Sequence, residues 1–406
     1  MVGSPRVVHR SRPRTLAATA AALALLAGTA SAQAPVLKIG APMPITGPAA
    51  AIGFTHQLGS AMAIREINAA GGIMGRQVQL LIADDQGDPT QSVNEVKRLI
   101  HQEKVELMLG PIISHLVLAA APILTEANVA TIHTGGAATI TPHVLPYGFS
   151  MFTSTDQQIK SMVRYAAEVA KVKSAAILTD TSAISKAAHE PLRAELKARG
   201  ITITGVQEHE ARAPDLTPQI LGLRRGNPDI ILFLTVTGED AGLAVKTLKD
   251  IGWNVPIVSP TFANVTPVVL KIAGPDAFKG GNVIGQTYKT FTYCPSDPVG
   301  TSPFAQFLAR LKAAEPAQFD RIATTTVSWL YDGAFILKAA VEGAKSTEGA
   351  KVAAWIEGNA STIPNRISGN VSASKTQHFL ISAESLELVS RADERRQDGM
   401  VLRAGC

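Results

Sequence analysis

The sequence lacks the short motifs that mark several classes of enzyme. It has no G-x-S-x-G turn, no H-E-x-x-H helix and no G-x-G-x-x-G dinucleotide turn. Residues 280–287 have phosphate-loop spacing, but Gln286 stands where the loop needs a lysine and the segment reads as a strand. The sequence therefore predicts no enzyme of these classes and no cofactor.

Candidate metal ligands and catalytic residues are also poorly arranged. Glu208, His209 and Glu210 are consecutive at a predicted strand end, so they cannot all point one way. We interpret them as a solvated polar edge rather than a metal site. Ser114 and His115 are adjacent and lack an identifiable acid partner, which does not fit a catalytic triad.

Cysteine is scarce, and an excess of positive charge is confined to the N-terminus. Cys294 and Cys406 would either pair, tying the C-terminus to the body, or remain two free thiols.

The formal charge of +5 falls to +1 without the four arginines of residues 1–32, which leaves 34 basic against 33 acidic residues. No Lys/Arg stripe remains, so we predict no nucleic-acid or membrane-surface partner.

No hydrophobic run is long enough to span a bilayer. Residues 16–27 form a short apolar run between that basic region and the small residues Ala30, Ser31 and Ala32. We interpret residues 1–32 as a secretory signal peptide cleaved before Gln33. Thr29 stands where a lipoprotein signal would carry a cysteine, which predicts a periplasmic protein without a lipid anchor.

What the sequence does contain is a clear alternation of strands and helices. The first set has strands at 36–40, 77–83, 105–109 and 130–133, a loop at 42–53, and helices ending near 69 and spanning 89–102 and 114–126. A second set has strands at 174–179, 202–207, 230–235 and 257–259, and helices at 157–170, 187–199, 217–225 and 240–251. This pattern predicts two α/β lobes with parallel sheets.

The remaining residues are too few for a third lobe of this kind. They hold a predicted strand at 282–286, helices at 302–314 and 324–342, and a polar tail. We expect an N-terminal lobe of 33–154 plus about 287–365, and a C-terminal lobe of 155–286 plus about 366–406. The final crossing would lie near 363–369, which gives a three-segment hinge.

The best candidate binding site lies where two predicted strands of the first set end. Ser114 starts a helix there, either as a simple N-cap or as part of a site for an anion, which helix N-termini attract. Thr134, Gly135 and Ala137 follow the next strand at the same edge. Open α/β sheets bind ligands at the carboxyl ends of their strands, which favours the anion site.

Several segments resemble the periplasmic leucine/isoleucine/valine-binding proteins of ABC importers. The resemblance lies in Thr46-Gly47-Pro48, Gly71-Gly72-Ile73, Asp84-Asp85 and Asp88-Pro89, and continues more loosely to about Gly369. Gly71 and Gly72 are expected to end a helix with positive φ, and Asp88-Pro89 to begin one. The resemblance implies a type I periplasmic binding protein fold, closing on a small solute between its lobes.

The resemblance also implies roles for individual residues. In amino-acid binders of the family, the positions of Ser114, Gly135 and Ala137 hold the ligand carboxylate, with a threonine where this chain has Ala137. Thr134 or Thr139 would compensate, and Ile52 joins the expected ligand-binding residues. Two tyrosines of the second lobe become Ile184 and Val236, and the glutamate that pairs with the ammonium becomes Thr261. Glu239 or Asp240 would replace that glutamate under a shifted register.

Together with the predicted signal peptide, the doubled α/β pattern and the absent catalytic motifs, the resemblance implies a solute receptor of an ABC importer. We expect a monomer without catalytic activity, whose partner is a membrane permease. Because the amino-group site is missing, the expected ligand is a small aromatic or branched aliphatic acid. An apolar amino acid, such as a branched-chain one, is the alternative within the class. A sensory receptor of the same fold and a secreted α/β enzyme are the rivals from other classes.

Overall fold

The computed structural model describes residues 1–5, 35–47, 49–235, 237–364 and 366–406, and the fold is built from Val36–Cys406. The predicted signal peptide lies almost wholly outside the described residues. No helix in the described part of the chain has the length and hydrophobicity needed to cross a membrane.

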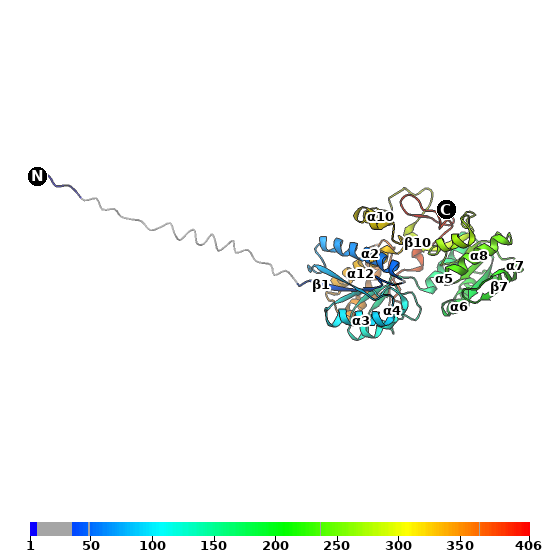
Figure 1. Cartoon of the computed structure of the whole chain (residues 1–406), viewed down its shortest axis with the longest axis horizontal. Helices are drawn as coiled ribbons and strands as arrows, with labels where there is room; N and C mark the ends of the chain where they lie inside the picture. Colours follow the sequence, from blue (N-terminus) through cyan, green and yellow to red (C-terminus); the bar gives the residue numbers. More distant parts are fainter. Residues whose placement is uncertain (6–34, 48, 236, 365) are drawn as a thin grey trace. The chain divides into compact units, whose positions relative to one another are not determined.

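The first sheet has five parallel strands in the order β2-β1-β3-β4-β5. Its strands are β1 (Leu37–Met43), β2 (Val78–Asp84), β3 (Leu107–Leu109), β4 (Thr131–His133) and β5 (Gly148–Ser150). Helices α2 (Ala50–Ala69) and α12 (Val327–Ala344) lie against each other on one face, and α3 (Pro89–His101) and α4 (Ser114–Glu126) cover the other (Figure 1). Both faces are thus buried, which explains the apolar strands.

The second sheet has six strands in the order β12-β10-β9-β8-β6-β7, all parallel except β12. Its strands are β6 (Ser174–Asp180), β7 (Thr202–His209), β8 (Ile230–Leu234), β9 (Ile257–Val258), β10 (Val283–Tyr288) and β12 (Leu386–Val389). Its helices are α5 (Thr155–Arg164), which a π-helical turn extends to Val169, α6 (Ala183–Ala198), α7 (Thr217–Arg224), α8 (Gly238–Asp250) and α9 (Thr266–Ala273).

Strand β8 shows why the second sheet needs helices on both faces. Its residues are all buried; Ile231 and Phe233 belong to one hydrophobic cluster, and Ile230, Leu232 and Leu234 to another. Successive side chains of a strand point to opposite faces, so a wholly apolar strand is stable only when both faces are covered. The predicted fold class, α/β with two doubly wound lobes, is confirmed.

The chain passes between the two sheets three times. It leaves the first sheet after β5, and returns to it after β10 through α10 (Pro303–Ala314), α11 (Pro316–Phe319), α12 and α13 (Gly349–Asn359). It rejoins the second sheet only at β12. The N–H groups of Ile367 and Ser368 donate to Asp332 of α12, and Phe379 bridges to Ser150 of β5. The last crossing is therefore later than the expected 363–369.

Several expected elements differ in extent. The loop predicted for 42–53 is shorter, because β1 continues to Met43 and α2 begins at Ala50. Gly53 lies inside α2, and the position requires glycine because a Cβ there would overlap the Pro44 carbonyl oxygen. Helices α9 and α13 were not predicted. The prediction of a polar tail after residue 342 is wrong, because α13 and β12 lie within that segment.

The turn segments that carry the resemblance have the conformations predicted for them. Helix α2 ends at Ala69, and Gly71 and Gly72 follow with φ of 98° and 82°. The Asp88 side chain accepts a bond of 2.9 Å from the Gln91 N–H and caps α3. Asp84 accepts bonds from the N–H groups of Ile45 and Thr46, which fixes the loop that leads into α2.

Candidate functional site

The carboxyl end of β3 leads into helix α4, whose first residue is Ser114. Ser114 is not the N-cap; that position belongs to Ile113, which has an extended backbone and no capping side chain. The Ser114 hydroxyl oxygen instead accepts bonds from the N–H groups of Gly136 (3.0 Å) and Ala137 (3.2 Å). The interpretation of Ser114 as a simple N-cap is therefore wrong, because its side chain bonds to the neighbouring loop.

The loop after β4 is held close to Ser114 by buried polar contacts. The Thr134 hydroxyl donates to the Ile112 carbonyl (2.6 Å), and the Gly135 carbonyl accepts from the Ser150 hydroxyl (2.7 Å). The Gly135 N–H donates to Nδ1 of His133 (3.1 Å). Burial lowers the pKa of His133 to about 3, with a smaller effect from His378, so the ring is neutral and can accept this bond.

This arrangement leaves donors free at the start of α4. The Ser114 oxygen uses its lone pairs for two N–H groups, so its own O–H remains available to donate. Neither the Ser114 N–H nor the His115 N–H has an acceptor within the described part of the chain. Free donors and the positive end of the helix dipole together form a site suited to a carboxylate.

Gly135 and Gly136 allow this loop to lie close to its neighbours. A Cβ on Gly135 would lie 3.3 Å from Cα of Ser114 and 3.0 Å from Val117, and one on Gly136 would overlap the Phe152 ring. The structure thus brings Ser114, Gly135 and Ala137 together, whereas the hydroxyl of Thr134 is directed to Ile112 and not to an open position.

The second-lobe candidates are placed only in part. The Thr261 hydroxyl donates to the Thr235 carbonyl (2.7 Å), and the Thr261 N–H donates to the Ser259 hydroxyl (3.3 Å). Thr261 therefore ties the ends of β8 and β9 together. Val236 and the side chain of Ile184 lie outside the described residues.

The solvent exposure of the remaining candidates differs between Ile52, Glu239 and Asp240. Ile52 lies in the first turn of α2 and is 49% exposed, unusual for a large apolar side chain. Glu239 is exposed, whereas Asp240 is buried and accepts a bond from the Arg212 N–H (2.9 Å). The other carboxylate oxygen of Asp240 is buried without a hydrogen-bond partner.

Between the lobes, the structure adds an aromatic cluster that the sequence did not indicate. The ring of Trp329, in the first turn of α12, lies 5.3 Å from that of Phe152, 6.0 Å from that of Tyr288 and 5.8 Å from that of His56. Trp329 Nε1 and His56 Nδ1 are buried without a hydrogen-bond partner. Trp329 was missed because its sequence context is an apolar helix, which indicates core rather than site.

Trp329, Phe152 and Tyr288 line a crevice of about 40 Å³ together with residues of both lobes. Its other lining residues include Thr153, Gln158, Pro260, Thr287 and Thr325. Small-molecule sites usually occupy about 300–1,000 Å³, so this crevice is too small to hold a solute by itself. We call this group of residues the cleft floor.

A larger cavity, of about 510 Å³, lies elsewhere in the second lobe. It is lined by Leu248, Trp253, Asn254, Asp276 and Asn282, among others, before the starts of β9 and β10. That is the amino edge of the sheet, opposite the edge at which open α/β sheets bind ligands. We therefore place the candidate site at the carboxyl edges despite the smaller volume there.

The motifs set aside from sequence have structural explanations. Residues 283–288 form strand β10, so the phosphate-loop spacing is accidental. His209 is buried rather than solvated as expected, and its Nδ1 lies 2.9 Å from the Glu210 carbonyl oxygen. Within the described residues, no group of three His, Cys, Asp or Glu side chains is arranged to hold a metal.

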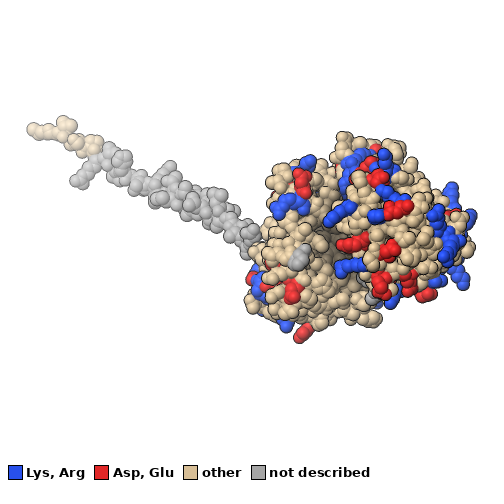
Figure 2. Space-filling model, turned by 45° about the vertical axis from the view of Figure 1, so that its right-hand side comes forward, with Lys and Arg blue, Asp and Glu red and all other residues tan. Residues whose placement is uncertain are grey.

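Charged side chains of both signs are mixed over the middle of the face shown in Figure 2, and Lys and Arg gather along its right-hand edge.

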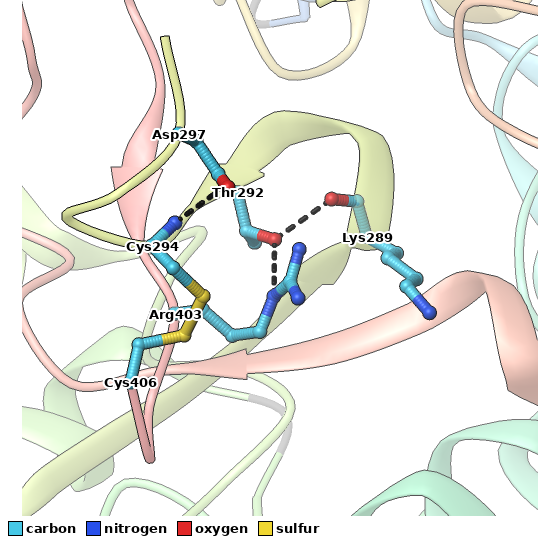
Figure 3. Close-up of a disulfide and its surroundings, with 6 residues drawn as sticks. All are labelled: Lys289, Thr292, Cys294, Asp297, Arg403 and Cys406. Atoms are coloured by element: carbon cyan, nitrogen blue, oxygen red, sulfur yellow. Dashed lines mark hydrogen bonds between the residues drawn. A yellow bond between two sulfur atoms is a disulfide. The ribbon is translucent and has the colours of Figure 1, made fainter.

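The two cysteines form a disulfide between Cys294 and Cys406, whose Cα atoms are 5.4 Å apart (Figure 3). Strand β13 (Val401–Leu402) pairs in parallel with β11 (Thr292–Tyr293) beside it. The Arg403 side chain donates from Nε to the Thr292 hydroxyl (3.0 Å), as Figure 3 shows. The C-terminus is thus joined to the segment that follows β10.

Comparison with known proteins identifies relatives over almost the whole folded chain. A family model described as periplasmic binding protein matches residues 36–383. The Leu/Ile/Val-binding protein BraC3 of Rhizobium johnstonii is 27% identical over 374 residues, 92% of this chain and 96% of the relative.

Solved structures share the fold. The isoleucine complex of the branched-chain amino acid transporter substrate binding protein LivJ from Streptococcus pneumoniae has a TM-score of 0.66 at 22% identity, covering 90% of this chain and 97% of that one. A solute binding protein of an ABC transporter from R. palustris, in complex with 4-hydroxybenzoate, has a TM-score of 0.66 at 19% identity, covering 90% and 95%. At these identities the similarity establishes the fold and not the ligand.

Proposed function

The chain belongs to the periplasmic binding protein family, whose members bind substrates rather than transform them, and from this premise we propose that it binds a small carboxylate for an ABC importer. The ligand would be an aromatic or branched aliphatic acid, held between the lobes and released to a membrane permease. We further propose that the receptor is exported by its signal peptide, acts as a monomer and has no catalytic activity.

The observation that carries the proposal is the set of donors at the start of α4. The O–H of Ser114 and the N–H groups of Ser114 and His115 are free, and the neighbouring N–H groups of Gly136 and Ala137 already bond to the Ser114 oxygen. A ligand carboxylate can accept hydrogen bonds from the three free donors without displacing the bonds that Gly136 and Ala137 make to Ser114. Charge-assisted bonds of this kind are about twice as strong as neutral ones.

The rest of the ligand would lie against apolar and aromatic surface. Ile52 is exposed at the start of α2, and the rings of Trp329, Phe152 and Tyr288 line the cleft floor. Aromatic rings pack edge-to-face or offset against one another, so this floor favours a flat or branched apolar group. The R. palustris protein with 4-hydroxybenzoate shows that the fold accommodates an aromatic acid.

The residue at the expected ammonium site favours an acid over an amino acid as the ligand. Thr261 carries no charge, and its hydroxyl is already used by the Thr235 carbonyl. An ammonium taken out of water without a carboxylate partner would lose several kcal/mol of solvation, roughly the free energy of a micromolar complex.

One observation favours an apolar amino acid as the second candidate. The free oxygen of the buried Asp240 carboxylate would accept a bond from an ammonium group. The relatives named as Leu/Ile/Val-binding proteins agree with this alternative. Against it, Asp240 is buried, and its other oxygen already accepts a bond from the Arg212 N–H.

Titration calorimetry against matched pairs decides between the two candidates. Each pair consists of an amino acid and the acid that lacks its α-amino group, such as leucine with 4-methylpentanoate and phenylalanine with 3-phenylpropanoate. We expect heat from the acids and none from the amino acids at equal concentration. Tight leucine binding with no response to any acid would overturn the ligand class and leave the receptor class intact.

A further inference from the structure

The C-terminal segment 391–399 carries three arginines, and only two of them have acidic partners. Arg391 pairs with Asp393 (3.2 Å) and with Glu394, and Arg396 pairs with Asp398 (2.7 Å). Arg395 pairs with no carboxylate among the described residues. Its side chain makes one hydrogen bond there, from Nη1 to the Gly399 carbonyl oxygen (3.1 Å).

Arg395 lies in a concave position beside the cleft floor. Its side chain lines a small crevice with Ala263, Thr287 and Thr325. Thr287 and Thr325 also line the cleft floor, so the two crevices adjoin. Arg395 remains accessible to solvent, yet the surrounding protein lowers the pKa of its guanidinium by desolvation. A cation in such a position is stabilised by any anion that enters the crevice.

The groups beside Arg395 match what a carboxylate needs. The hydroxyls of Thr287 and Thr325 have no hydrogen-bond partner within the described part of the chain and can donate. A guanidinium offers a planar pair of N–H donors that fits the two oxygens of a carboxylate. The acids of the segment, Asp393, Glu394 and Asp398, are already paired with the other arginines.

The backbone that carries Arg395 is fixed at several points. The disulfide between Cys294 and Cys406 closes the segment, and Arg395 itself bridges to Val401. The Arg396 guanidinium lies 4.2 Å from the centre of the Tyr293 ring, a cation–π contact. A binding side chain on a fixed backbone holds its geometry without a large loss of entropy on binding.

We propose that Arg395, with the hydroxyls of Thr287 and Thr325, forms a second anion subsite, and that the solute is a dicarboxylate. One carboxylate would bind at the start of α4 and the other at Arg395, with the apolar middle of the solute on the cleft floor. This inference rests on the proposed function, because it takes the first carboxylate site as given.

The test compares acids that differ only in the second carboxylate. Benzoate and terephthalate form one pair, and hexanoate and adipate form the other. Calorimetry on the full exported chain should show the diacid of at least one pair binding about ten- to a hundredfold more tightly than its monoacid, the usual gain from one charge-assisted pair. Arg395→Gln should remove this preference and leave the monoacid unchanged.

Control variants separate binding from structure. Arg225→Gln makes the same charge change at an exposed position at the end of α7, and it should leave both acids unaffected. Arg395→Lys keeps the charge and should restore part of the preference for the diacid. A thermal unfolding midpoint equal to that of the unmodified protein would show that Arg395→Gln keeps the fold, despite losing its bond to Gly399.

The outcomes are distinguishable. Equal binding of monoacids and diacids by the unmodified protein, or a preference for diacids that survives Arg395→Gln, would overturn the second subsite while the receptor for small acids stands. Binding of amino acids but of none of the four acids would overturn the proposed ligand class and this inference together. Loss of monoacid binding in Arg395→Gln would assign Arg395 to the first carboxylate and would also overturn the dicarboxylate.

Discussion

Replacing Ser114 by alanine tests the anion site most directly. The hydroxyl has two roles that the structure separates: its oxygen accepts the N–H groups of Gly136 and Ala137, and its O–H is free for a ligand. Alanine removes both roles without adding bulk. Both folding stability and ligand affinity should therefore fall, for different reasons.

The size of each effect follows from these contacts. Two N–H groups lose their acceptor, and because both contacts are only partly buried, water will replace much of the lost bonding. We expect the free energy of unfolding to fall by about 1–2 kcal/mol, toward the low end for unsatisfied donors. The ligand loses one charge-assisted bond, worth about 1.5–3 kcal/mol.

The freed N–H groups of Gly136 and Ala137 can donate to the carboxylate instead, which recovers part of the loss. The net loss of affinity should be about 1–2 kcal/mol, or about 5- to 30-fold. Titration calorimetry with an acid found to bind gives the affinity, and urea unfolding of the ligand-free protein gives the stability.

Ser302→Ala is the matched control. Ser302 caps helix α10, and its hydroxyl oxygen accepts the Ala305 N–H at 3.0 Å. It should lose about 1 kcal/mol of stability through the cap and none of the affinity. If Ser114→Ala keeps full affinity while losing stability like Ser302→Ala, then Ser114 only supports the loop and the carboxylate binds elsewhere.

Three further predictions use other parts of the structure. Trp329→Phe keeps an aromatic ring on the cleft floor but removes the unpartnered Nε1–H. It should weaken acid binding, measured by calorimetry, by about 0.5–1.5 kcal/mol. Unchanged affinity would show that this N–H does not reach the ligand. Replacing Cys294 and Cys406 by alanine removes a disulfide between residues 112 positions apart in the chain. The free energy of unfolding, measured in urea, should fall by about 2–4 kcal/mol. An unchanged urea midpoint would contradict this prediction. Burial lowers the pKa of His56 from 6.5 to about 4, so between these pH values the unfolded chain binds a proton that the folded chain does not. The free energy of unfolding should therefore fall as the pH drops from about 6.5 to 4, and His56→Gln should reduce this fall by about 3 kcal/mol. An equal fall in both proteins would refute this role of His56.

Local signals in the sequence predicted much of the fold. Residues 230–234 are apolar without interruption, and such a run is stable only inside a sheet covered on both faces, as β8 is. Gly71, Gly72 and Asp88 specify their turns through positive φ and capping, which depend on near neighbours in the chain. Elements fixed by such local chemistry were predicted close to their observed bounds.

The site was less predictable because its contacts join distant segments. Ser114 and Ala137 lie at the ends of adjacent strands, so their proximity followed from strand order, but only the structure shows the Ser114 oxygen accepting the Ala137 N–H. Trp329 and Arg395 gave no signal at all. One lies in an apolar helix, and the other in a polar segment where three arginines look alike.

By itself, the sequence determined the class of the protein: turn glycines, capping aspartates and apolar strands define two α/β lobes, since each depends on residues close in the chain. The tertiary structure decided which polar groups keep unused hydrogen-bond donors after folding. The free donors at α4, the indole of Trp329 and the guanidinium of Arg395 are identified only when every neighbour's hydrogen bond is placed. Under the proposed function a ligand would bind those groups, so its chemistry is inferred from the folded chain.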